Sequence, residues 1–125
     1  MLKKILLSLL FLGVMAFPAF AGVYEDALKN NKKVFLYLYV DKCKYCSNFE
    51  PIYKKVSSTY GKQCKFLKVN ADTKEGYHLM KLFGARYVPF VIIADSDLQE
   101  ISQIEPNCLL NFKCTNYFVD RFIRR

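Results

Sequence analysis

Val34-Phe-Leu-Tyr-Leu-Tyr-Val-Asp-Lys-Cys-Lys-Tyr-Cys46 begins with seven apolar residues and ends in two cysteines separated by two residues. A run that is apolar on both faces and rich in β-branched and aromatic residues predicts a central strand covered by helices on both sides. After it, apolar residues recur at helical spacing and Gly61 marks a stop, which predicts a helix over 46–60. The cysteine pair is therefore expected where a buried strand ends and a helix begins.

The rest of the chain reads as alternating helices and strands. Short helices are expected at 22–31, 73–83 and 117–123, and strands at 64–69, 89–94 and 98–104. In the helix over 73–83 the expected core positions are Tyr77, Met80, Leu82 and Phe83. The order predicts an α/β fold: the β-α-β-α-β part implies right-handed crossovers and parallel pairing, and a hairpin adds antiparallel strands. A loop holding Pro106 and Cys108 is expected before the last helix.

The first 21 residues have the pattern of a secretory signal peptide. Lys3 and Lys4 precede an apolar run, and Ala19-Phe-Ala21 supplies the small residues that a signal peptidase accepts. The alternative is a retained membrane anchor, although Pro18 and the alanine-rich end interrupt the run before it reaches the ~20 good apolar residues of a spanning helix. We expect residues 1–21 to be the signal, residues 22–125 to be one domain, and the product to be periplasmic or secreted without further membrane attachment.

The charges argue against nucleic-acid binding. The chain carries 19 Lys and Arg against 11 Asp and Glu, a formal net charge of +8, which stays positive without residues 1–21. The basic residues are scattered, and their longest runs are only pairs such as Lys32-Lys33 and Arg124-Arg125. Such spacing is typical of solvated faces and not of a basic stripe.

The spacing Cys43-Lys-Tyr-Cys46 favours a redox-active pair. At a helix start, free N–H groups and the helix dipole stabilise a thiolate at Cys43, and Lys42 and Lys44 add positive charge beside it. Cys46 follows one turn later, within disulfide reach. The expected cycle is attack by Cys43 on a substrate disulfide, followed by resolution of the mixed disulfide by Cys46.

Two alternatives remain open for this pair: half of a zinc site, and a purely structural disulfide. Zinc needs further ligands, and the chain offers no second C-x-x-C; the other cysteines are scattered and His78 is the only histidine. We therefore expect neither a metal nor another resident cofactor.

From about Lys32 onward, the chain resembles a thioredoxin-fold protein. The apolar strand leads into Cys43-x-x-Cys46, Pro51 stands where thioredoxins carry the proline that kinks the active-site helix, and Gly84-Ala-Arg-Tyr-Val-Pro89 resembles the family's cis-proline segment. The resemblance implies a central four-stranded mixed sheet flanked by helices. It also implies a cis Pro89 loop opposite the cysteine pair, with Val88 offering its backbone to an extended substrate.

The sequence departs from thioredoxin around the cysteines. It has no Trp, and Tyr45 lies within the motif, a combination that with the leader looks more like the exported disulfide-exchange branch of the superfamily. Thioredoxins place a buried acid six residues before the first cysteine, where this chain has Tyr37. The nearest upstream acid, Asp41, is expected to be exposed. Proton transfer to and from Cys46 therefore has to use water or another group.

The remaining cysteines are expected to be structural. Because export favours pairing, Cys108 and Cys114 are predicted to form a local disulfide at the same end of the molecule as Cys43, with redox participation as the alternative. Cys64 is expected to be a half-buried free thiol, with intermolecular pairing as the alternative. His78 is expected to be an ordinary helical residue.

Together these features predict an exported monomeric thiol–disulfide oxidoreductase that reduces or exchanges disulfides of protein substrates and is recycled by a redox partner protein. Two other functions stay open at this point. One is a non-catalytic binding module with structural disulfides, and the other is a metal-binding domain that uses Cys43 and Cys46.

Overall fold

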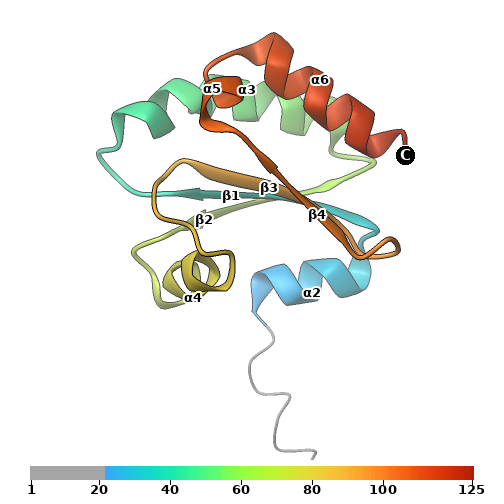
Figure 1. The fold of residues 1–125 in the computed structure, drawn as a ribbon, viewed down its shortest axis with the longest axis horizontal. Coiled ribbons are helices and arrows are strands. Elements are labelled where there is room, and N and C mark those ends of the chain that lie inside the picture. The colour runs from blue at the N-terminus through green and yellow to red at the C-terminus, as the bar shows by residue number, and fades with distance from the viewer. Residues whose placement is uncertain (1–21) are drawn as a thin grey trace, which may run out of the picture.

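The computed structural model describes residues 22–125, so the predicted signal peptide lies outside the described part of the chain. One four-stranded sheet carries helices on both faces (Figure 1). Its strands, in the spatial order β2-β1-β3-β4, are β1 (Lys33–Tyr39), β2 (Lys65–Asn70), β3 (Phe90–Asp95) and β4 (Glu100–Ile104). The predicted α/β fold with a four-stranded mixed sheet is confirmed.

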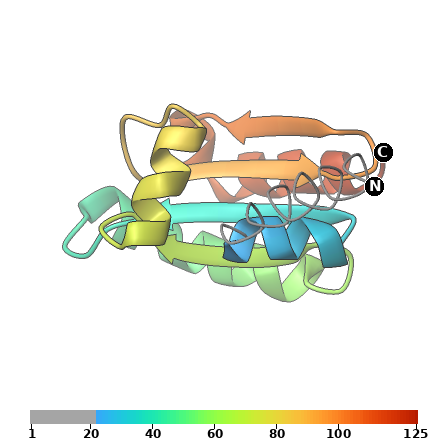
Figure 2. The same ribbon diagram turned by 90° about the horizontal axis from the view of Figure 1, so that it is seen from below.

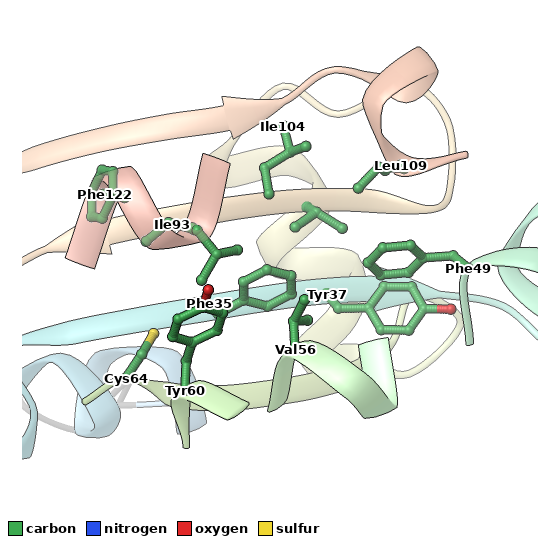
Figure 3. Packing of buried hydrophobic residues seen from close by; sticks show 12 residues of the cluster. Phe35, Tyr37, Phe49, Val56, Tyr60, Cys64, Ile93, Ile104, Leu109 and Phe122 are labelled. Atoms are coloured by element: carbon green, nitrogen blue, oxygen red, sulfur yellow. The ribbon is translucent and has the colours of Figure 1, made fainter. Parts of the chain in front are cut away.

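The central position predicted for the apolar run is also confirmed. β1 lies between β2 and β3, and its residues from Lys33 to Leu38 are all buried. Because side chains alternate along a strand, β1 supplies both cores of the molecule. Phe35 and Tyr37 (Figure 3) face α3 (Lys44–Tyr60) and α6 (Phe112–Ile123), two helices that cover one face of the sheet (Figure 1). Leu36 and Leu38 face α2 (Val23–Asn30) and α4 (Lys74–Leu82).

The direction of β3 corrects the expectation of parallel pairing through the β-α-β-α-β part. β1 and β2 are parallel, but β3 runs antiparallel to β1, with Leu38 paired to Phe90. The reason is α4: it has nine residues, about 14 Å at 1.5 Å per residue, and it lies across the strands instead of returning along them (Figure 2). The chain therefore enters β3 at the end of the sheet where β1 finishes.

Helix boundaries and some core positions differ from the prediction. The predicted loop around Pro106 contains a short helix, α5 (Pro106–Leu109), and α6 begins five residues before the predicted Tyr117. In α4 the expected core residues Tyr77 and Leu82 are exposed. The other two expected positions, Met80 and Phe83, do pack against the core. They share the inward face with Gly76 and Leu79, at spacings of three or four residues.

Gly76 provides a test of how closely α4 packs on the sheet. A Cβ at this position would lie 2.0 Å from the backbone oxygen of Asn70. Helix propensity alone predicts that Gly76→Ala stabilises the protein by about 1 kcal/mol. We expect the opposite sign, a loss of roughly 1–3 kcal/mol, because the backbone of α4 or β2 has to move. Urea denaturation measures the difference, and equal or higher stability of the variant would contradict this packing.

Candidate active site

Cys43 and Cys46 lie at the start of α3, directly after β1. Cys43 is the residue that caps the helix, and its Sγ accepts a hydrogen bond from the backbone N–H of Cys46 at 3.1 Å. The two residues are joined by a disulfide, with their Cα atoms 5.2 Å apart. Cys43 is half-buried, whereas Cys46 is only 4% exposed. The pair therefore has one sulfur that a substrate can approach and one that is shielded beneath it.

The surroundings of Cys43 are electropositive. The first turn of α3 contains no acidic residue, and the side chains of Lys42 and Lys44 are exposed on either side of Cys43. Lys42 has φ of 59°, in the left-handed region, where the chain turns from β1 into the helix. Free helix N–H groups and two lysines favour an anionic sulfur at this position once the disulfide opens.

The loop before β3 reaches the same end of the sheet. Its Val88–Pro89 peptide is cis, the isomer that the family resemblance implies. β3 pairs with the last residues of β1 immediately after this loop, so the loop and the cysteine motif emerge side by side. The structure thus brings together Val88, Pro89 and the motif residue Tyr45, which share one pocket.

That pocket has a volume of about 360 Å³ and a mostly apolar lining. Tyr45 contributes from the cysteine motif and residues 87–89 from the cis-proline loop. The third wall comes from α5 and the residue after it, including Leu109 and Leu110. The sequence placed the Cys108–Cys114 segment at this end of the molecule but did not predict the helix α5, because four residues are too few to show a periodic pattern.

A second disulfide holds the third wall. Cys108 of α5 is bonded to Cys114 of α6, with Cα atoms 5.2 Å apart, and the backbone oxygen of Cys108 accepts a hydrogen bond from Thr115 Oγ1 at 2.9 Å. Leu109 is buried in the core beside them. Because α5 lines the same pocket as Pro89, this disulfide lies at the active-site end of the molecule.

A polar cluster that the sequence did not predict lies beneath Cys46. The buried phenol of Tyr37 lies 3.2 Å from the backbone oxygen of Cys46 and 3.1 Å from Oε2 of Glu50. The other oxygen of Glu50 forms an ion pair with Lys68 Nζ of β2. Burial, followed by the negative charge of Glu50, raises the pKa of Tyr37 well above its ordinary value. Asp41, in contrast, is exposed, as predicted.

The sequence contained one signal for this cluster. Glu50 follows Cys46 by four residues, which places the two side chains on one face of a helix. The partner Lys68 was not predictable from spacing. Its position opposite Tyr37 depends on the register of β1 with β2.

The other titratable residues considered earlier lie elsewhere. Cys64 is buried in the core between α3 and the sheet, deeper than the half-buried position expected, and burial raises its pKa to about 12. His78 is exposed on α4, near Glu25. Residues 22–125 contain no cluster of three or more His, Cys, Asp or Glu side chains suited to a metal ion. Within the same range, every helix is too short or too polar to cross a membrane.

Comparison with known proteins agrees with this geometry. The sequence profile of the thioredoxin family matches residues 17–108. No curated protein matches the whole sequence significantly. Among solved structures, the oxidised thioredoxin from Plasmodium falciparum superposes with a TM-score of 0.65 at 16% identity, covering 80% of this chain and 89% of the other. A mutant thioredoxin from Halobacterium salinarum gives 0.67 at 19% identity, with coverages of 82% and 86%.

The J-Trx1 fragment of ERdj5 gives a TM-score of 0.68 at 15% identity over 82% of this chain, which spans about half of that fragment (48%). At these identities the solved structures support the fold alone. The profile match covers most of the chain and includes the segment from the cysteine motif to the cis-proline loop. The chain therefore belongs to the thioredoxin family, and its Cys43–Cys46 bond is the C-x-x-C active-site disulfide of a domain consistent with a thiol–disulfide oxidoreductase.

Proposed function

We propose that the protein is an exported thiol–disulfide oxidoreductase that reduces or exchanges disulfides in protein substrates through Cys43 and Cys46. The observation that carries the proposal is the asymmetry of the pair. Cys43 is half-buried at a helix start with lysines on both sides, whereas Cys46 is buried one turn further on. A dithiol built in this way has one sulfur for attack and one for resolution.

In the reducing direction the cycle starts from the dithiol. The Cys43 thiolate attacks one sulfur of the substrate disulfide, a Cys43–substrate bond forms, and the first substrate thiolate leaves. Cys46 then loses its proton and attacks Cys43, which releases the second substrate thiolate and restores the Cys43–Cys46 disulfide. Two electrons pass from the protein to the substrate, and a partner dithiol protein returns them. Run backwards, the same steps oxidise a substrate dithiol.

The pocket beside the disulfide favours polypeptide substrates over small thiols. In this proposal an extended segment whose cysteine reaches Cys43 runs past Pro89 and pairs with the backbone of Val88, the role that the family resemblance implies for this residue. Tyr45, Tyr87 and Leu110 then present exposed apolar surface to the residues next to that cysteine. Within this proposal the protein acts as a monomer.

Export rests on the sequence of residues 1–21, with their basic start, apolar run and Ala19-Phe-Ala21 end. Mass spectrometry of the protein from its native cell measures this directly. We expect the mature chain to begin at Gly22 and to be recovered outside the cytoplasm, in the periplasm or the medium. A cytoplasmic protein that retains Met1 would contradict export and leave the redox chemistry untouched.

The redox function is tested by the dithiothreitol-dependent reduction of insulin. The wild-type domain is expected to accelerate reduction catalytically, because each turnover regenerates the Cys43 thiolate. Cys43→Ser is expected to abolish the acceleration, and Cys64→Ser, which alters a buried thiol outside the cycle, is the matched control. A wild-type protein that binds insulin without catalysing its reduction would instead indicate a non-catalytic binding module.

The role of the pocket is tested by a pair of surface substitutions. Leu110 and Tyr117 are both exposed, 57% and 62% respectively, but only Leu110 lines the pocket. We expect Leu110→Ser to raise KM for a protein substrate about fivefold, because partial burial of a Leu side chain is worth roughly 1 kcal/mol. Tyr117→Ser should leave KM unchanged, and reduction of a small disulfide should be equal in both variants. If Leu110→Ser and the wild type had equal KM values for the protein substrate, the pocket would have no role in substrate recognition.

A further inference from the structure

In the cluster of Tyr37, Glu50 and Lys68 beneath Cys46, the Tyr37 hydroxyl has one more hydrogen-bond acceptor in reach than it has hydrogens to donate. The Tyr37 phenol has a single hydrogen, yet two acceptors lie within hydrogen-bond distance of its oxygen: the Cys46 carbonyl at 3.2 Å and Glu50 Oε2 at 3.1 Å. When Glu50 is ionised, only one of these acceptors can receive that hydrogen. When Glu50 is protonated, its own O–H donates to the Tyr37 oxygen, and the Tyr37 hydrogen is free for the Cys46 carbonyl. The arrangement is then fully hydrogen-bonded.

This cluster links a carboxylate to the backbone of the buried cysteine, because the Tyr37 hydroxyl lies within hydrogen-bond distance of both. Glu50 lies one helical turn from Cys46, and side chains at this spacing have Cβ atoms about 5–6 Å apart. Side chains on adjacent turns of one helix face can meet through their end groups, directly or through one water molecule. Asp41, the other acid near the motif, is exposed, and the position that holds the buried acid in thioredoxins is occupied by Tyr37.

We propose that Glu50, positioned by Tyr37 and Lys68, accepts the proton that the Cys46 thiol loses when it resolves the mixed disulfide. The proposal rests on the function proposed above. The Cys46 S–H bond breaks, its proton goes to the Glu50 carboxylate, and the sulfur keeps the electron pair. That sulfur bonds to Cys43, the Cys43–substrate bond breaks, and the substrate departs as a thiolate. Glu50 later returns the proton to solvent or, in the reverse direction, to Cys46.

The groups that face Glu50 suit this role. Tyr37 and Tyr53 remain protonated over the working range, since burial, followed by the charge of Glu50, raises the pKa of Tyr53 to about 12 and that of Tyr37 further. Lys68 Nζ pairs with Glu50 and lies 4.5 Å from the centre of the Tyr39 ring. The charged and titratable groups around this site are therefore one carboxylate, one ammonium and the phenols of Tyr37, Tyr39 and Tyr53. Of these groups, the carboxylate is the charged hydrogen-bond acceptor, so it is the one suited to receive a proton from Cys46.

Glu50→Gln tests the proposal, because glutamine keeps the shape of the side chain and can donate to Tyr37 but cannot accept the proton. Reduced protein is mixed rapidly with excess of a chromogenic aromatic disulfide. The first release of aryl thiolate reports attack by Cys43, and the second reports resolution by Cys46. Near neutral pH we expect the second phase to slow by on the order of 100-fold, the lower end of general-base effects. The rate should recover towards wild type at alkaline pH, where Cys46 ionises unaided.

Asp41→Asn is the matched control, since it removes one negative charge next to the same motif, and it should leave the second phase within about twofold of wild type. A Glu50→Gln protein that resolves at the wild-type rate, or that is slowed equally at every pH, would overturn the proposal. If Glu50→Gln does not fold, Tyr37→Phe replaces it: loss of the phenol should also slow the second phase near neutral pH, and an unchanged rate would overturn the role of the cluster. Absence of the first phase in the wild type would instead refute the proposed function.

Discussion

The burial of β1 between two strands and two helical layers is the constraint on which the rest of the molecule depends. A strand that is apolar on both faces can lie only in the middle of a covered sheet, and its pairing with both β2 and β3 fixes where its last residue lies. The chain leaves the sheet there and turns through Lys42 into α3, which places Cys43 at the helix start. Because β3 runs antiparallel to β1, it begins at the end of the sheet where β1 finishes, and Pro89 therefore lies at the same end as Cys43. The site is therefore a consequence of how one strand is buried.

The same strand explains why the polar chemistry of this domain differs from that of its family. Tyr37 points from β1 into the core, where its ring packs against Phe49 with centroids 4.9 Å apart (Figure 3). A phenol in this position gains apolar contacts and has no charge to bury, whereas a carboxylate would lose solvation. The negative charge lies instead on the half-buried Glu50 of α3, where Lys68 balances it. The Tyr37 hydroxyl is thus the buried side-chain group through which β1 meets the cysteine motif.

The sequence was sufficient for features that depend on local pattern. All four strands, the helix that carries the cysteines and the central place of residues 34–40 follow from period and composition, and each strand boundary lies within two residues of the prediction. The direction of β3 was not predictable, because it depends on how α4 crosses the sheet. Two further features were not predictable either. The helix α5 is too short to give a periodic signal, and the Tyr37–Glu50–Lys68 cluster joins three elements whose contact depends on strand register. Pairwise spacing captures contacts within an element and misses those between elements.

The central claim is that Cys43 attacks the substrate disulfide and Cys46 resolves the mixed disulfide. Trapping of the mixed disulfide tests this claim most directly. A Cys46→Ser variant, incubated with a disulfide-containing protein substrate and quenched with acid, should accumulate a covalent complex. Peptide mapping should locate the bond at Cys43, and a reductant should release the substrate. A Cys43→Ser variant should form no such complex under the same conditions. A complex linked through Cys64, Cys108 or Cys114, or equal trapping by the two variants, would contradict the assignment.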